Sequence, residues 1–207
     1  MLMNEFLSPV ERYYSDKLAE FGTRPQGVDW NGPEGQVKRF EQLCKVLPAE
    51  GSYSVADIGC GYGALLDFLS NNAKHFEYVG LDISATMIDA ARELHAARPN
   101  AEFIVGTQPS RNVDFAIASG IFNVKLNAED DAWNTYIVET LEAMNGYATR
   151  GFAFNCLTAY SDREKMRDNL HYADPRALFD LCKRRFARNV ALLHDYDLYE
   201  FTIVVRK

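Results

Sequence analysis

A short apolar run that leads directly into three closely spaced glycines constrains this chain more than any other feature. Residues 55–69 read VADIGCGYGALLDFL. The first part predicts a buried strand, and the amphipathic part after Gly63 predicts a helix. Gly59, Gly61 and Gly63 let the backbone turn tightly and approach a ligand, while the helix N-terminus offers free amide groups. The segment therefore predicts a ligand-binding turn at the carboxyl end of a strand.

The rest of the chain predicts an α/β fold. Apolar runs predict strands at 53–58, 78–81, 101–105, 113–118, 151–156, 189–193 and 198–205, and other patterns predict helices at 6–21, 33–47, 63–71, 84–97, 129–145 and 175–186. Alternating strands and helices favour a doubly wound, mostly parallel sheet of seven strands. Only the turn HDYD separates the last two strands, so the C-terminal strand forms an antiparallel hairpin. We expect one domain over residues 1–207, with residues 1–48 as an N-terminal helical cap.

One connection does not fit a regular alternation. Only residues 107–112 join the third and fourth predicted strands. A parallel crossover normally needs a dozen residues or more. Either this crossover has lost its helix, or the predicted strand boundaries are wrong there.

Two carboxylates suggest which ligand the turn binds. Asp82 ends the second strand about twenty residues beyond the glycines, where an acidic side chain can accept both ribose hydroxyls. Asp82 could instead begin the cap of the next helix. Gly59, Gly61 and Ala64 also satisfy the dinucleotide spacing G-x-G-x-x-A, which leaves NAD open. However, Asp57 would repel a pyrophosphate and favour the ammonium and sulfonium of S-adenosylmethionine (SAM).

The motifs D-I-G-C-G-Y-G and G-L-D-I-S together resemble the class I SAM-dependent methyltransferase family, over roughly residues 35–207. The closing hairpin is similar to the antiparallel final strand of that family. The resemblance implies in-line transfer of the SAM methyl group. The implied cofactor-binding residues are Asp57, Gly59, Gly61, Gly63, Asp82, Ile83, Gly106, Thr107 and Ser119. Many family members carry an acidic residue where this chain has Thr107, so the resemblance is weaker at the adenine.

The acceptor side is less clearly marked. His171 is the first candidate for a general base and His194 the second, because both follow predicted strands at the carboxyl edge. A surface or packing role fits each histidine at least as well. The residues that could shape an acceptor pocket are Asn123, Tyr160 and Tyr172. Tyr13, Tyr14 and Trp30 lie in the cap, which either closes over the cofactor or only packs on the sheet edge.

Composition narrows the partners. A formal net charge of −7 argues against a broad nucleic-acid surface, and no apolar run is long enough to cross a bilayer. The four cysteines and four histidines form no zinc pattern, so we expect no metal. We expect a cytoplasmic monomer or homodimer that methylates a small molecule on a hydroxyl, such as that of a sugar. The alternatives are a non-catalytic SAM-binding partner subunit and an NAD-linked oxidoreductase.

Overall fold

The computed structural model describes residues 3–30, 32–72 and 75–207. The helices are α1 (Met3–Phe21), α2 (Pro33–Leu43), α3 (Ala64–Asn72), α4 (Ala85–Leu94), α5 (Asp130–Tyr147) and α6 (Pro175–Arg185), with short 3-10 turns at Pro25–Val28, Cys44–Val46 and Arg163–Lys165. The strands are β1 (Tyr53–Ile58), β2 (Phe76–Asp82), β3 (Ala101–Val105), β4 (Val113–Ala118), β5 (Ala148–Leu157), β6 (Asn189–Leu193) and β7 (Glu200–Arg206).

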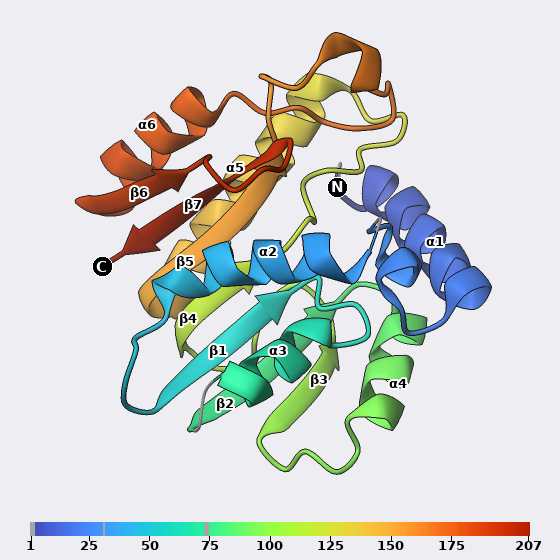
Figure 1. Ribbon diagram of the computed structural model, residues 1–207, viewed down its shortest axis with the longest axis vertical. Coiled ribbons are helices and arrows are strands. Elements are labelled where there is room, and N and C mark those ends of the chain that lie inside the picture. The colour runs from blue at the N-terminus through green and yellow to red at the C-terminus, as the bar shows by residue number, and fades with distance from the viewer. Residues whose placement is uncertain (1–2, 31, 73–74) are drawn as a thin grey trace.

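The seven strands form one sheet in the order β3-β2-β1-β4-β5-β7-β6 (Figure 1). The first five strands pair in parallel, and β7 lies antiparallel between β5 and β6. The order in which strands are added to the sheet reverses between β1 and β4, so the carboxyl ends of these two parallel strands open a crevice at the switch point. This arrangement confirms the predicted doubly wound sheet with its C-terminal hairpin.

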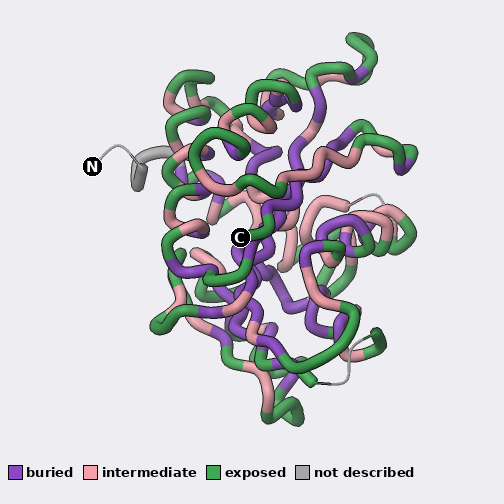
Figure 2. The backbone as a smooth tube through the Cα atoms, turned by 90° about the vertical axis from the view of Figure 1, so that its left-hand side faces the viewer, coloured by how far each residue is buried: buried purple, intermediate pink, exposed green. Residues whose placement is uncertain are grey.

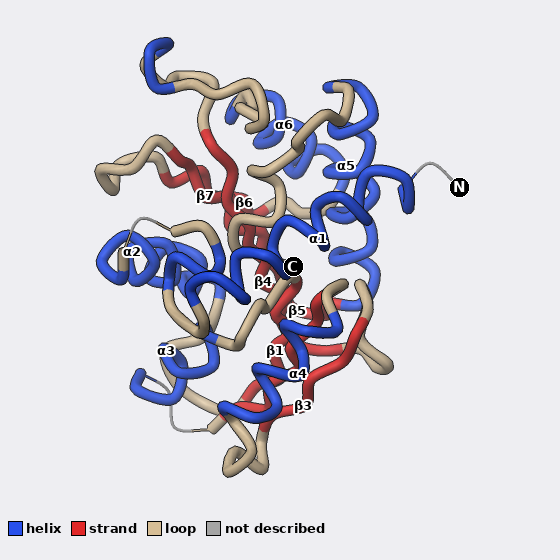
Figure 3. Tube along the Cα trace, turned by 90° about the vertical axis from the view of Figure 1, so that its right-hand side faces the viewer, coloured by secondary structure: helices blue, strands red, loops and turns tan. Residues whose placement is uncertain are grey.

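Helices cover both faces of the sheet, as the side view in Figure 3 shows. Alternate strand residues separate into two buried clusters, because successive side chains point to opposite faces. Ala56 and Ile58 of β1 pack with residues of α5, whereas Val55 packs with residues of α2, α3 and α4. The inner strands β1, β2, β4, β5 and β7 are accordingly mostly buried, whereas the edge strands β3 and β6 are largely half-buried or exposed (Figure 2).

The predicted boundaries of β1, β3, β4 and β6 are confirmed, and the remaining elements differ by a few residues. The helix expected to reach residue 97 ends at Leu94, and the one expected to reach residue 47 ends at Leu43 and continues as a 3-10 turn. No helix lies between β3 and β4, where seven residues make the crossing. The short connection is therefore a crossover without its helix, and the strand boundaries around it hold.

Helix α1 lies beyond the carboxyl ends of β1 and β2, next to α4 (Figure 1). A hydroxyl cluster joins α1 to the start of α4, with Ser15 Oγ and Ser84 Oγ 2.9 Å apart. None of the described helices is both long and apolar enough to cross a membrane. The position of α1 places it over the crevice that the sheet opens.

Candidate functional site

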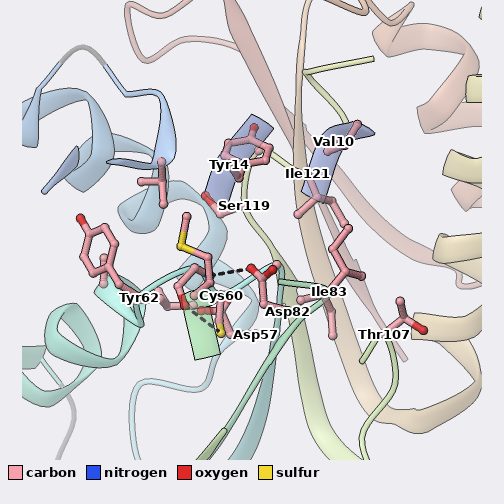
Figure 4. Close-up of a pocket in the computed structure, with 18 of the residues that line it drawn as sticks. Val10, Tyr14, Asp57, Cys60, Tyr62, Asp82, Ile83, Thr107, Ser119 and Ile121 are labelled. Carbon is pink, nitrogen blue, oxygen red and sulfur yellow. Dashed lines mark hydrogen bonds between the residues drawn. The ribbon is translucent and has the colours of Figure 1, made fainter. Parts of the chain in front are cut away.

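A deep cavity lies where the carboxyl ends of β1, β2 and β4 meet helix α1. Its volume is about 940 Å³ when the open mouth is included. Figure 4 shows Asp57 and Asp82 on the sheet side of this cavity and Val10 and Tyr14 on the α1 side. The cavity therefore has a polar floor on the sheet and a more apolar cover from the N-terminal part of the chain.

The glycine turn forms part of the floor. Gly59 has φ +69° and Gly61 has φ +54°, values that residues with a side chain rarely adopt. A Cβ atom at Gly59 would lie 2.2 Å from Ile121 Cγ2, and one at Gly61 would lie 2.8 Å from Val28 Cγ1. Both glycines line the cavity. Backbone thus reaches the cavity wall at a place where no side chain fits.

Gly63 has a different environment from the other two glycines. It lies outside the cavity lining, and a Cβ atom there would lie 2.7 Å from Nε2 of the buried His95. His95 Nε2 also lies 3.2 Å from the carbonyl oxygen of Tyr62, and its ring stacks on Phe103. Gly63 therefore allows α3 to begin close against the C-terminal end of α4.

Asp82 connects β2 to the glycine turn. Its Oδ2 accepts a hydrogen bond from the backbone N–H of Gly61 at 2.9 Å, and its Oδ1 accepts one from the N–H of Ser84 at 2.9 Å. Burial raises the pKa of this carboxyl, and the backbone N–H groups partly oppose that shift. Each oxygen keeps a lone pair, so Asp82 can fix the turn and still accept hydrogen bonds from a ligand.

Asp57 is a carboxylic acid buried almost completely in the cavity floor. Asp57 is 2% exposed, and its Oδ2 accepts a hydrogen bond of 2.6 Å from the Tyr78 hydroxyl. Burial raises the pKa of Asp57 to about 7; the Tyr78 hydrogen bond lowers it and the nearby Asp82 carboxylate raises it. A buried carboxylate that accepts a single hydrogen bond from the described residues is well placed to bind a cation.

The opposite wall combines Ser119, which the sequence resemblance implied, with Tyr136, which the sequence motifs did not indicate. Ser119, Gly120 and Ile121 follow β4 and face the cavity, as does Tyr136 of α5. Within the described chain, the buried Ser119 Oγ has no hydrogen-bond partner. Burial raises the pKa of the Tyr136 hydroxyl, which therefore stays neutral near pH 7. Tyr136 lies far from both glycine motifs in sequence, so no local pattern could have indicated it.

Two aromatic residues of the predicted cap also line the cavity. Tyr14 comes from α1, and Trp30 lies just before α2. Tyr13 instead donates a hydrogen bond of 2.8 Å to Asp29. The cofactor-side residues Ile83, Gly106 and Thr107 line the cavity as well. Because Tyr14 and Trp30 line the cavity, the structure favours a cap that covers the cavity over one that only packs on the sheet edge.

The residues predicted for the acceptor side do not line this cavity. His171 is buried, with Nδ1 3.8 Å from Asp130 and, within the described chain, no partner for Nε2. Asn123 Oδ1 accepts a hydrogen bond from the N–H of Leu157. The other three lie on loops: His194 packs near Tyr160, and Tyr172 Oη accepts a hydrogen bond from the N–H of Arg167. The catalytic role of the two histidines therefore stays a prediction.

Comparisons with known proteins fit this geometry. A family model described as a methyltransferase domain matches residues 55–142. The putative methyltransferase Rv1506c of Mycobacterium tuberculosis is 53% identical over 163 residues, which is 79% of this chain and 98% of that protein. The 18S rRNA (guanine-N(7))-methyltransferase RID2 of Arabidopsis thaliana is 36% identical over 92 residues, 43% of this chain and 30% of that protein.

Among solved structures, the N-methyltransferase NodS of Bradyrhizobium japonicum, in complex with S-adenosyl-L-homocysteine (SAH), superposes with a TM-score of 0.67 at 13% identity. That superposition covers 95% of this chain and 97% of NodS, so the two share a fold. The sheet order, the glycine turn and the match to Rv1506c over 79% of this chain all indicate the same family. The chain belongs to the class I SAM-dependent methyltransferase family.

Proposed function

We propose that this methyltransferase transfers the SAM methyl group to a hydroxyl of a small, uncharged acceptor. The observation that carries the proposal is the charge of the cavity. Its described lining contains two carboxylates, Asp57 and Asp82, and no lysine, arginine or histidine. Such a lining favours a cationic cofactor and disfavours an anionic acceptor.

The described residues fit SAM at each end of the molecule. In this proposal the ammonium of the methionine portion pairs with Asp57, whose buried carboxyl accepts one hydrogen bond from the described residues, that of the Tyr78 hydroxyl. The backbone at Gly59 and Gly61 lies against the same portion. Asp82 receives the ribose hydroxyls on the lone pairs that Gly61 and Ser84 leave free. Ile83, Gly106 and Thr107 flank the adenine.

The same charges disfavour the NAD alternative. A dinucleotide would bring its pyrophosphate to the glycine turn. Asp57 lines the same cavity, and this residue is only 2% exposed. Two like charges at close range in a partly dehydrated site repel strongly. Charge does not separate a catalyst from a SAM-binding partner subunit without activity, so that alternative calls for a measurement of methyl transfer.

When bound, SAM would supply an electrophilic methyl group: the acceptor oxygen bonds to the methyl carbon as its bond to sulfur breaks, SAH is left, and the hydroxyl proton passes to water at the open mouth of the cavity. The protein contributes mainly alignment, since holding the acceptor oxygen in line with the methyl removes much of the entropic cost of a two-substrate reaction. We propose that Tyr14, Trp30 and Ile121 provide that alignment, because all three line the same cavity as the two carboxylates. Burial raises the pKa of the Tyr14 hydroxyl, so it acts as a neutral hydrogen-bond donor and not as a base.

A small acceptor is favoured over a nucleic acid. The chain carries a formal net charge of −7, and nucleic-acid affinity comes mostly from clustered lysine and arginine. The match to RID2, whose name specifies an 18S rRNA guanine, covers only 43% of this chain. The wall that faces the acceptor is largely aromatic and aliphatic, which suits a small molecule with an apolar face.

The test is methyl transfer from labelled SAM to acceptors that differ only in charge. Matched pairs are methyl glucoside with methyl glucuronide, and 4-hydroxybenzamide with 4-hydroxybenzoate; total RNA forms a third arm. We expect label in uncharged members, and we expect the Asp82→Asn variant to bind SAH more than tenfold more weakly, since an amide replaces the carboxylate acceptor. Label confined to the carboxylates or to RNA would contradict the proposed acceptor class. Saturable SAH binding without any transfer would favour the non-catalytic alternative.

A further inference from the structure

A closed ring of contacts joins the N-terminal part of the chain to the loop after β4. The Arg39 guanidinium lies 3.9 Å from the centre of the Trp30 ring and binds the Glu200 carboxylate through Nε and Nη2, at 2.5–3.0 Å. Asn155 Nδ2 donates to Glu200 Oε2 at 2.5 Å, and Asn155 Oδ1 accepts the N–H of Gly120 at 2.8 Å. Gly120 then packs against Trp30 and closes the ring.

The contact between Gly120 and Trp30 leaves no room for another residue. Gly120 has φ +79°, and a Cβ atom there would lie 2.5 Å from the indole. Arg39 covers a face of the same indole, so the Trp30 indole is in contact with Gly120 and with Arg39 from two directions. Trp30 and Gly120 both line the cavity, so two members of this ring of contacts form part of the cavity wall.

The ion pair in this ring is buried. The Glu200 side chain is 1% exposed and that of Arg39 is 12% exposed, while Asn155 is fully buried. Removing two charges from water costs free energy that their attraction only partly returns, so buried ion pairs are poor devices for stability. Their best-attested use is to fix one arrangement over others. Here, the fixed arrangement is that of two cavity-lining residues.

We propose that Arg39 and Glu200 are positioning residues of the methyl-donor site. Without touching the cofactor, they hold Trp30 and Gly120 as one rigid wall, Arg39 through the indole and Glu200 through Asn155. Preorganisation of this wall keeps the cofactor and the acceptor aligned. The proposal rests on the placement of the cofactor proposed above.

The experiment measures the exposure of Trp30 and the affinity for SAH. The chain has two tryptophans, and Trp133 is fully buried with its indole N–H bonded to the Phe122 carbonyl oxygen. Iodide quenching of tryptophan fluorescence therefore reports on Trp30. In Glu200→Gln we expect stronger iodide quenching, with and without SAH, and a loss of SAH affinity of about tenfold, equivalent to roughly one well-placed hydrogen bond.

The matched control is Asp197→Asn, because Lys38 and Asp197 form an exposed ion pair of 3.6 Å between α2 and the turn before β7. It should leave quenching and SAH affinity unchanged. Glu200→Gln leaves Arg39 buried without its partner charge and can unfold the protein. The double variant Arg39→Met/Glu200→Gln removes both charges and should recover stability without restoring the protection of Trp30.

The outcomes separate positioning from stability and from the proposed function. Recovery of both stability and Trp30 protection in the double variant would overturn the inference, because the pair would then act only through folding. Unchanged quenching and SAH affinity in a folded Glu200→Gln protein would also overturn it. If the unaltered protein bound no SAH, the proposed cofactor site would fail. The quenching data without SAH would still decide whether Glu200 holds Trp30.

Discussion

Asp57 shows how one buried side chain can link cofactor binding to pH. Its carboxyl is 2% exposed and accepts a hydrogen bond from Tyr78. Burial raises its pKa to about 7, so a substantial fraction is protonated at neutral pH before any ligand binds. A bound ammonium would favour the ionised form and lower the pKa again. Proton release and cofactor binding are therefore coupled at this residue.

The coupling predicts a pH dependence that Asp57→Asn should remove. Because the pKa in the folded protein lies above its unfolded value near 4, the folded state holds a proton that the unfolded state releases. Stability therefore falls as pH rises from about 4 through about 7, by at most about 1.4 kcal/mol per pH unit. SAH affinity should rise over the upper part of that interval. Urea unfolding and calorimetry on both proteins between pH 5 and 8 measure the difference, and parallel curves would contradict the assignment.

At the same scale, sequence reasoning found the cofactor floor better than the opposite wall. Asp57, Gly59, Gly61 and Asp82 lie at strand ends with recognisable local patterns, and all of them line the cavity. Tyr136 belongs to an ordinary amphipathic helix, and only the folded chain brings it to the cavity. Local spacing cannot encode contacts made by distant elements.

At the scale of elements, the junction between α1 and α4 determines how the cavity is covered. Ser84 is the N-cap of α4, and its Oγ accepts a hydrogen bond from the N–H of Met87 at 3.2 Å. The same hydroxyl lies 2.9 Å from Ser15 Oγ on α1 and 2.8 Å from Thr86 Oγ1. One buried serine thus caps the start of α4 and also contacts α1, the helix above the cavity.

Ser84→Ala should therefore destabilise both features. Loss of the cap lowers the free energy of unfolding by about 1 kcal/mol. Thr86→Ala is the matched control, because it removes hydroxyl contacts to Ser15 and Ser84 but leaves the cap of α4 in place. Urea unfolding gives the free energies, and hydrogen exchange reports whether α1 opens more often. Equal stability losses in the two variants would show that the cap contributes little.

The elements themselves were largely predictable. The predicted bounds of strands β1, β3, β4 and β6 match the structure to the residue, because short apolar runs between polar segments define them. The end of α4 was misplaced, since Pro99 limits a helix without fixing its last turn, and His95 already leaves helical geometry with φ −109° and ψ 20°. The helix missing between β3 and β4 was one of two alternatives that the sequence left open.

For the whole molecule, the cavity brings together parts of the chain that lie far apart in the sequence. The cavity is lined by α1, the segment around Trp30, the glycine turn and the loop after β4. A ligand that contacts all of them binds only the folded chain, so its binding energy adds to the stability of the entire fold. The fold should therefore respond to SAH as a unit, and a ligand with a different charge pattern should have no such effect.

Thermal unfolding tests this directly. At an SAH concentration of about 100 times the dissociation constant, mass action adds about 2.7 kcal/mol, which for a chain of this size raises the melting temperature by roughly 5–10 °C. NADH at the same concentration should produce no shift, because Asp57 disfavours its pyrophosphate. Asp82→Asn should reduce the SAH shift in proportion to its weaker binding. A shift with NADH but not with SAH would contradict the argument that Asp57 excludes a pyrophosphate. Equal shifts with both ligands would show that the adenosine portion dominates binding and that Asp57 does not select the cofactor.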